Sequence, residues 1–151
     1  MTFNRWGTRI PLAAVALAGA ACGLRRAHPL ASRDGVQIEA AYAHPSAGDV
    51  AAAYFRIANR GATTDTLQTV INAGGGNAMV MNTVGGRMAP MGSLVLAPGS
   101  AVVMAPGGIH VMFGGLTRDW SIGDTIHLTL RFARVGELAV AVPVLPFGEI
   151  P

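Results

Sequence analysis

The chain has 151 residues and a mass of 15.5 kDa, which is enough for one ordinary domain. Apolar residues make up 51% of it, charged residues make up 13%, and the mean hydropathy is +0.43; these values exclude a disordered, highly charged protein. All eleven basic residues are Arg, scattered without interleaved aromatics, which excludes a nucleic-acid interface. One Cys stands against seven Met, so the chain has no intrachain disulfide and no Cys-x-x-Cys pair.

Residues 1–22 have the composition of an export signal. Arg5 and Arg9 are followed by an uncharged run rich in Ala, Leu and Val, and then by small residues and Cys22. The run is shorter than the roughly 20 residues of a membrane-spanning helix. Two cleavage modes remain open: a lipoprotein-type signal, in which a lipidated Cys22 would anchor the protein, and simple cleavage near Ala20. Either mode predicts an exported protein, with residues 23–35 as a tether.

Residues 36–145 alternate with a period of two, which indicates strands. Ile126, Leu128, Leu130 and Phe132 share one strand face, for example, and His127 lies on the other. Gly- and Pro-containing turns separate eight or nine such segments, and no stretch has the pattern of a long amphipathic helix. The sequence therefore predicts an all-β domain, an antiparallel sandwich or barrel, followed by a tail at 146–151.

The chemistry-bearing residues of this domain are Met and His. On a strand, His110 and Met112 would project from one face while Val111 enters the core. Twenty-one residues separate Met88 from His110, and hairpin turns between them could bring their strands side by side. Thioether and imidazole donors suit Cu(I), whereas the hard oxygen and thiolate ligands of calcium and zinc sites are missing. The alternative is that methionines fill the core, as we expect for Met104.

The spacing Met88-x21-His110-x-Met112 resembles the metal signature of periplasmic copper chaperones of the PCu(A)C type, which is His, ten residues, Met, twenty-one residues and His-x-Met. The runs 54–61 and 106–112 are similar to the family's early strand and its most distinctive segment. The resemblance covers about residues 36–144. It implies a cupredoxin-like, Greek-key β-sandwich and a protein that carries Cu(I) in the periplasm towards a copper acceptor, notably cytochrome oxidase or its assembly factors.

One position departs from the family signature. Asn77 stands where the family has its first His, and an amide oxygen is a poor Cu(I) ligand. Residue by residue, the resemblance therefore carries over Met88, His110 and Met112. Met81 is the preferred fourth ligand because many family members have Met there. Met79 and Met91 are held in reserve, as is Asn77 itself.

The remaining histidines have simpler explanations. We expect His127 on a solvent-exposed strand face, His44 in a turn before Pro45, and His28 in the tether. His44 or His28 could serve as a mobile auxiliary donor, but we predict that none of the three is a ligand.

The leading hypothesis is an exported copper(I) chaperone without enzyme activity, with Cu(II) binding left open. The alternative is a degenerate relative that keeps the sandwich, has lost useful metal affinity, and acts as a structural or interaction module. A blue-copper protein is disfavoured because the only Cys lies in the export signal.

Overall fold

The computed structural model describes residues 28–151, which contain eleven β-strands and no helix. No helix able to cross a membrane occurs in this range. The predicted export signal at 1–22, including Cys22, and the first part of the predicted tether lie outside the described residues. The strands are β1 (Ala31–Arg33), β2 (Val36–Ala43), β3 (Ala51–Asn59), β4 (Asp65–Asn72), β5 (Asn77–Val84), β6 (Arg87–Gly92), β7 (Leu94–Leu96), β8 (Ala101–Val103), β9 (His110–Gly114), β10 (Thr125–Phe132) and β11 (Gly136–Pro143).

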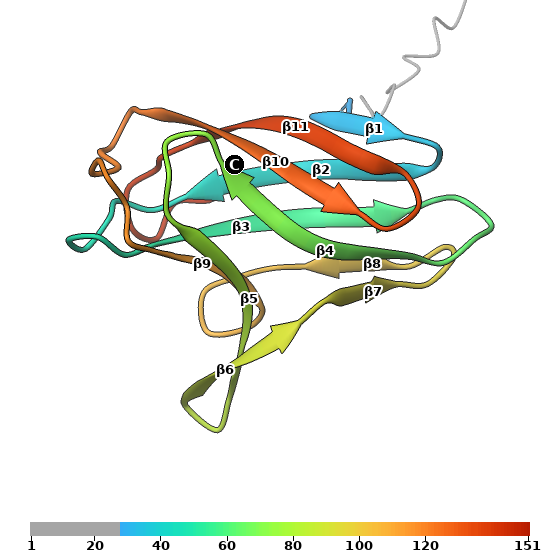
Figure 1. The fold of residues 1–151 in the computed structure, drawn as a ribbon, viewed down its shortest axis with the longest axis horizontal. Helices are drawn as coiled ribbons and strands as arrows, with labels where there is room; N and C mark the ends of the chain where they lie inside the picture. Colours follow the sequence, from blue (N-terminus) through green and yellow to red (C-terminus); the bar gives the residue numbers. More distant parts are fainter. Residues whose placement is uncertain (1–27) are drawn as a thin grey trace, which may run out of the picture.

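The strands form two antiparallel sheets that pack face to face (Figure 1). The larger sheet has the order β1-β2-β3-β9-β5-β6, with β8 also paired to β3, and the smaller has the order β11-β10-β4-β7. The prediction of an all-β, antiparallel sandwich is confirmed. Strands distant in sequence are neighbours in the larger sheet, since β9 lies between β3 and β5.

The space between the sheets is filled by alternate side chains of the strands. Ile126, Leu128, Leu130 and Phe132 of β10 are all buried, whereas His127 is exposed, as the alternation predicted. Met104 is also buried in the core, as expected. Burial of this kind is the dominant stabilising term of such a fold.

The structure has more strands than the eight or nine expected. Residues 31–33, within the predicted tether, form β1 and pair with β2. At the other end, Leu145 donates a backbone hydrogen bond to Ala43. Strand β1 has only three residues, too few to show a period in the sequence, whereas the short apolar segments expected at 93–96 and 101–104 are present as β7 and β8.

Two features of the larger sheet position the predicted ligands His110, Met112 and Met88. Strands β8 and β9 pair with the same edge of β3 and are separated by a loop at 104–109, in which Gly107 adopts φ of 79°, a conformation that favours glycine. The second feature is the β5–β6 hairpin, whose end projects beyond the other strands at the bottom of Figure 1. All six residues of β6 are exposed.

Candidate metal site

His110 and Met112 project from the outer face of the larger sheet. Val111 between them is fully buried in the core, so strand alternation places its two neighbours on the opposite face. His110 is 6% exposed and Met112 is half-buried. The predicted common face of His110 and Met112 is therefore confirmed.

Strand β5 places two further methionines beside this pair. Met81 lies directly opposite His110 in the ladder, and Met79 lies opposite Met112. Met81 is buried, whereas Met79 is 52% exposed. Asn77 is paired with Gly114, at the far end of β9 from His110, and is exposed. The residue that replaces the family's first His is thus not beside His110.

Met88 reaches the same region from β6. It pairs with Thr83 of β5, and its side chain is 58% exposed. The β5–β6 register shifts between Val80 and Met81, which leaves Met91 unpaired in the ladder. The expectation that the strands of Met88 and His110 lie side by side was wrong, because β6 and β9 flank β5 on its two sides.

Met88, His110 and Met112 line one cavity of about 330 Å³ on this outer face. Thr83, Tyr54 and the loop residues Pro106 and Gly107 contribute further walls. The cavity is floored by small residues of β3, Ala51 and Ala52 among them. The structure therefore brings together the three residues on which the spacing argument depended, whereas Met79, Met81, Met91 and Asn77 do not line this cavity.

The loop before β9 orients the His110 ring. Its Nδ1 lies 2.9 Å from the carbonyl oxygen of Gly108. A carbonyl can only accept, so Nδ1 is the donor and carries the proton in the neutral ring. Nε2 then presents its lone pair, and such an anchoring contact is typical of metal-binding imidazoles.

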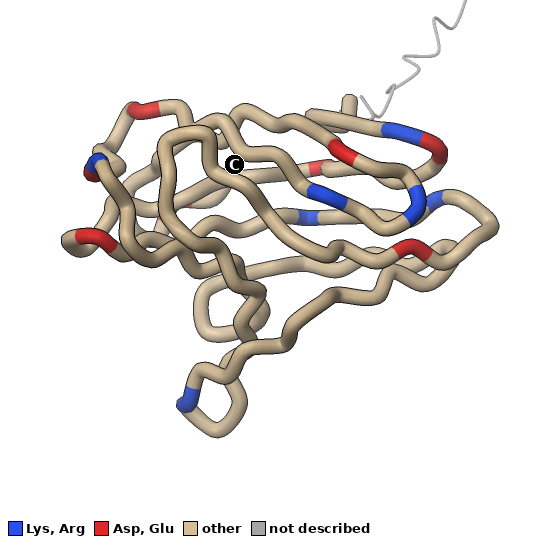
Figure 2. Tube along the Cα trace, viewed as in Figure 1, with Lys and Arg blue, Asp and Glu red and all other residues tan. Residues whose placement is uncertain are grey.

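The electrostatic surroundings are nearly neutral. Residues 66–117 contain a single charged side chain, Arg87, so the projecting hairpin shows one basic position and no acidic one (Figure 2). Burial, and secondarily the neighbouring Tyr42, raises the pKa of Tyr54, which keeps the phenol of this cavity wall neutral. Two thioethers and one neutral imidazole form a donor set that fits Cu(I) better than a hard divalent cation.

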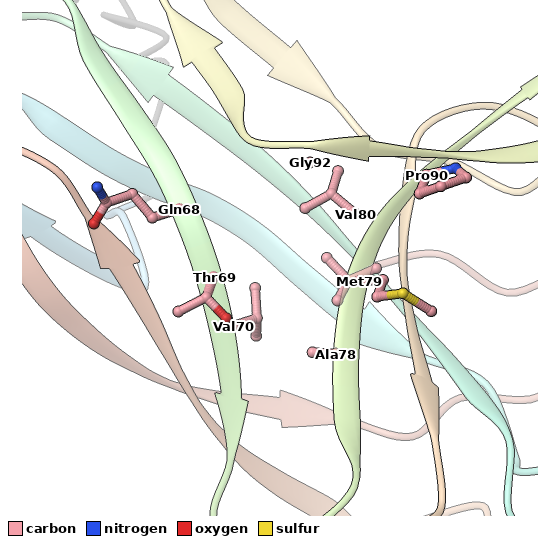
Figure 3. A pocket seen from close by; sticks show the side chains of 9 residues that line it. Gln68, Thr69, Val70, Ala78, Met79, Val80, Pro90 and Gly92 are labelled. Carbon is pink, nitrogen blue, oxygen red and sulfur yellow. The ribbon is translucent and has the colours of Figure 1, made fainter.

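A second, smaller cavity of about 170 Å³ lies between β4 and β5. Thr69 and Val70 of β4 face Ala78 and Val80 of β5 there, and the Met79 side chain extends away from Val70 (Figure 3). Met79 supplies the only sulfur of this cavity and no imidazole accompanies it, so the soft donors converge in the first cavity instead.

His44 is the residue whose position the sequence did not reveal. It is 6% exposed and lines the cavity together with His110. The following Pro45 suggested a turn, but His44 continues the alternation of β2, in which Tyr42 shares its face. The two-residue offset between Tyr42 and His44 was the signal in the sequence that could have placed His44 on this face. Within residues 28–151, no group of three or more His, Cys, Asp or Glu side chains is arranged to hold a metal, so any site here depends on thioethers.

Comparison with protein families finds one matching model, described as putative lipoprotein LpqE-like, over residues 36–144. A search of curated protein sequences finds no match.

Several solved structures share the fold. The apo PCuAC domain of PmoF2 is 23% identical, with a TM-score of 0.71, over 82% of this chain and 98% of that domain. The copper-bound PCuAC domain of PmoF2 is 24% identical, with a TM-score of 0.67, over 77% and 97% of the two chains. The solution structure of CuI-DR1885 from Deinococcus radiodurans is 24% identical, with a TM-score of 0.62, over 73% and 78%. At these identities the likeness establishes the fold.

Proposed function

Because the chain belongs to the LpqE-like family of putative lipoproteins, whose model matches residues 36–144, we propose that it is an exported copper(I)-binding protein that passes its metal to a partner. The observation that carries this proposal is the shared cavity of Met88, His110 and Met112. The PCuAC fold of the neighbouring structures, two of which hold copper by their descriptions, supports it.

The donor set suits transport rather than storage. Met88 is more than half exposed at the edge of the projecting hairpin, so one ligand is accessible to an incoming partner. Neutral thioethers hold Cu(I) without the charge of a thiolate, and the ion can then move by stepwise ligand exchange. No bond in a substrate is made or broken in such a transfer, and we expect no enzyme activity.

The proposed location is supported by the family assignment, and the proposed recipient by the resemblance to periplasmic copper chaperones. The family's description as lipoproteins supports export to the periplasm and anchoring through a lipidated Cys22, with 23–35 as tether and 36–145 as the copper-binding domain. The proposed recipient is a copper-accepting periplasmic or membrane protein, with cytochrome oxidase or its assembly factors as the first candidates. Cu(I) is the proposed cargo, and Cu(II) binding is to be measured alongside it.

A second candidate function is favoured by one observation. Asn77 lies exposed at the far end of the β5–β9 ladder, so the site lacks the first imidazole of the PCu(A)C-type signature at that position. A member with weakened metal affinity would then act as a structural or protein-interaction sandwich.

Competition for Cu(I) with a chromophoric chelator separates the two functions. The full chain carrying Cys22→Ser, which removes the one thiol, is compared with the same chain bearing His110→Ala and Met112→Ala. We expect the double variant to bind at least about tenfold more weakly, a loss of roughly 1.4 kcal/mol or more.

Met104→Leu is the matched control for the removal of a methionine. It changes a thioether in the core at nearly constant volume and should leave Cu(I) affinity unchanged. If the double variant binds Cu(I) as tightly as the parent chain, the copper-chaperone function is wrong and the interaction module is favoured.

A further inference from the structure

His44 occupies a defined place in the row of residues that crosses the cavity floor. Its backbone NH bonds to the carbonyl of Ala52, at 3.3 Å, and so extends the β2–β3 register beyond Ala43. Ala52 in turn pairs with Met112 of β9. His44, Ala52 and Met112 therefore lie side by side on three neighbouring strands, on one face of the sheet.

The small side chain at the centre of this row leaves room for a metal ion. Ala52 ends at Cβ, so nothing from β3 fills the space between His44 and Met112. With strands about 4.8 Å apart, the two outer backbones are separated by about 10 Å. An imidazole and a thioether that lean towards one another across Ala52 span that distance with one ion between them.

The His44 ring is anchored in the same way as the His110 ring, through Nδ1 and a backbone carbonyl. Its Nδ1 donates to the carbonyl of Leu145 at 3.1 Å, which leaves the lone pair on Nε2. Its ring centroid lies 5.5 Å from that of Tyr54 and 5.0 Å from that of Phe147, so aromatic contacts fix the ring plane. Within residues 28–151, no hydrogen bond reaches Nε2 of either His44 or His110.

Tyr54 links the two imidazoles. Its ring contacts His44 on one side and lies 6.3 Å from the His110 ring on the other, and all three line the same cavity. Tyr54 is the common wall against which both rings are placed. Two preoriented imidazoles and two thioethers thus border one space, from β2, β6 and β9.

We propose that His44 is a copper ligand, supplying from the end of β2 the second imidazole that position 77 lacks. The resulting donor set is His44, Met88, His110 and Met112. This proposal rests on the proposed copper(I)-binding function. Asn77 then needs no role in metal binding, and Met81, buried beside His110 and outside the cavity lining, does not coordinate the metal. The neutral two-imidazole, two-thioether set is suited to a soft monovalent ion.

Nitrogen NMR of the histidine rings tests this assignment directly. The full chain with Cys22→Ser is labelled with ¹⁵N and titrated anaerobically with Cu(I) alone. We expect the Nε2 resonances of His44 and His110 to shift together and saturate at one equivalent, while those of His127, exposed on the other sheet, stay in place.

The outcomes separate the two proposals. A shift at His110 with none at His44 overturns the role of His44 and leaves the copper-binding function intact. No shift at either ring, together with no competition against a chelator, overturns both.

Substitution provides an independent measurement. His44→Phe keeps an aromatic ring among Tyr54 and Phe147 but removes both nitrogens, and His127→Phe is the matched control for loss of an exposed histidine. Cu(I) affinity should fall roughly tenfold or more in the first variant and remain unchanged in the second.

X-ray absorption at the copper edge should show two nitrogen scatterers in the parent chain and one in His44→Phe. Equal affinity and two nitrogens in both chains contradict the proposal. If His44→Phe does not fold, the NMR titration of the parent chain decides.

Discussion

At the scale of single residues, register determines which methionine can act as a donor. Met81 faces His110 across one ladder step yet is buried and lies outside the cavity lining, whereas Met88 lines the cavity and is exposed. The resemblance carried over Met88 and favoured Met81 as an additional, fourth ligand. The geometry keeps Met88 in the cavity lining and leaves Met81 outside it.

Leucine substitutions at these two positions test that distinction. Met88→Leu should weaken Cu(I) binding about tenfold or more, because a coordinating sulfur is lost at nearly constant volume. Met81→Leu should change the affinity less than about threefold, since a packing residue is exchanged for one of similar size. Chelator competition on both variants provides the measurement, with Met104→Leu as control. The reverse order of effects would restore Met81 as the ligand.

At the scale of elements, the β5–β6 hairpin carries Met88 away from the core. Gly85 and Gly86 form its turn with φ of 58° and 77°, the positive values that two-residue hairpin turns require. A Cβ added at either glycine meets no neighbour within 4 Å, so backbone conformation and not crowding limits substitution there. Because β6 is wholly exposed, this strand adds little to the core, to which β5 contributes Val80.

Changes to this turn should therefore affect copper binding more than global stability. Gly85→Val with Gly86→Val forces β-branched residues into positive φ, at a cost of about 1–2 kcal/mol each, and should fray β6 and weaken Cu(I) binding. Gly85→Asn, which tolerates this conformation, is the matched control and should bind normally. Amide hydrogen exchange of β6 and chelator competition measure the two effects. Unchanged Cu(I) affinity in a frayed double variant would mean that Met88 does not hold the metal.

At the scale of the whole molecule, the ion pairs and the candidate metal ligands lie in different parts of the fold. The ion pairs of the described residues lie on β2, β3, β4, β10, β11 and the loops beside them, while the hairpin and the loop before β9 carry only Arg87 (Figure 2). Glu39 of β2 is the centre of one network, with Arg56 Nε at 2.6 Å and Arg60 as its second partner. Burial raises the pKa of Glu39, but the hydrogen bonds and charges of the two arginines outweigh it and lower the pKa below 4.5.

The lowered pKa of Glu39 predicts a pH-dependent contribution to stability. A carboxylate with a lower pKa in the folded state stabilises the protein above its unfolded pKa, and this contribution is lost as pH falls through the folded value. Glu39→Gln should therefore reduce the free energy of unfolding at pH 7, and the difference from the parent chain should shrink as pH falls below about 4.5. Urea unfolding at several pH values measures it. A difference that is independent of pH would show that the carboxylate charge is not responsible.

The sequence by itself determined what is local. A period of two is a property of consecutive residues, so it identified the strands, placed Val111 in the core and set His110 and Met112 on one face. The Met88–His110 spacing selected three residues that the structure brings to one cavity. The short strand β1 was not predicted from the sequence because three residues show no measurable period.

Only the tertiary structure decided which strands are neighbours. Pairing of β9 between β3 and β5 puts His110 beside Met81, and extension of the β2–β3 ladder puts His44 in line with Met112. These contacts join segments tens of residues apart, and strand pairing depends on the packing of both sheets together rather than on any one segment. A histidine before a proline looked like a turn residue for that reason, and only the folded sheet places it beside the other soft donors.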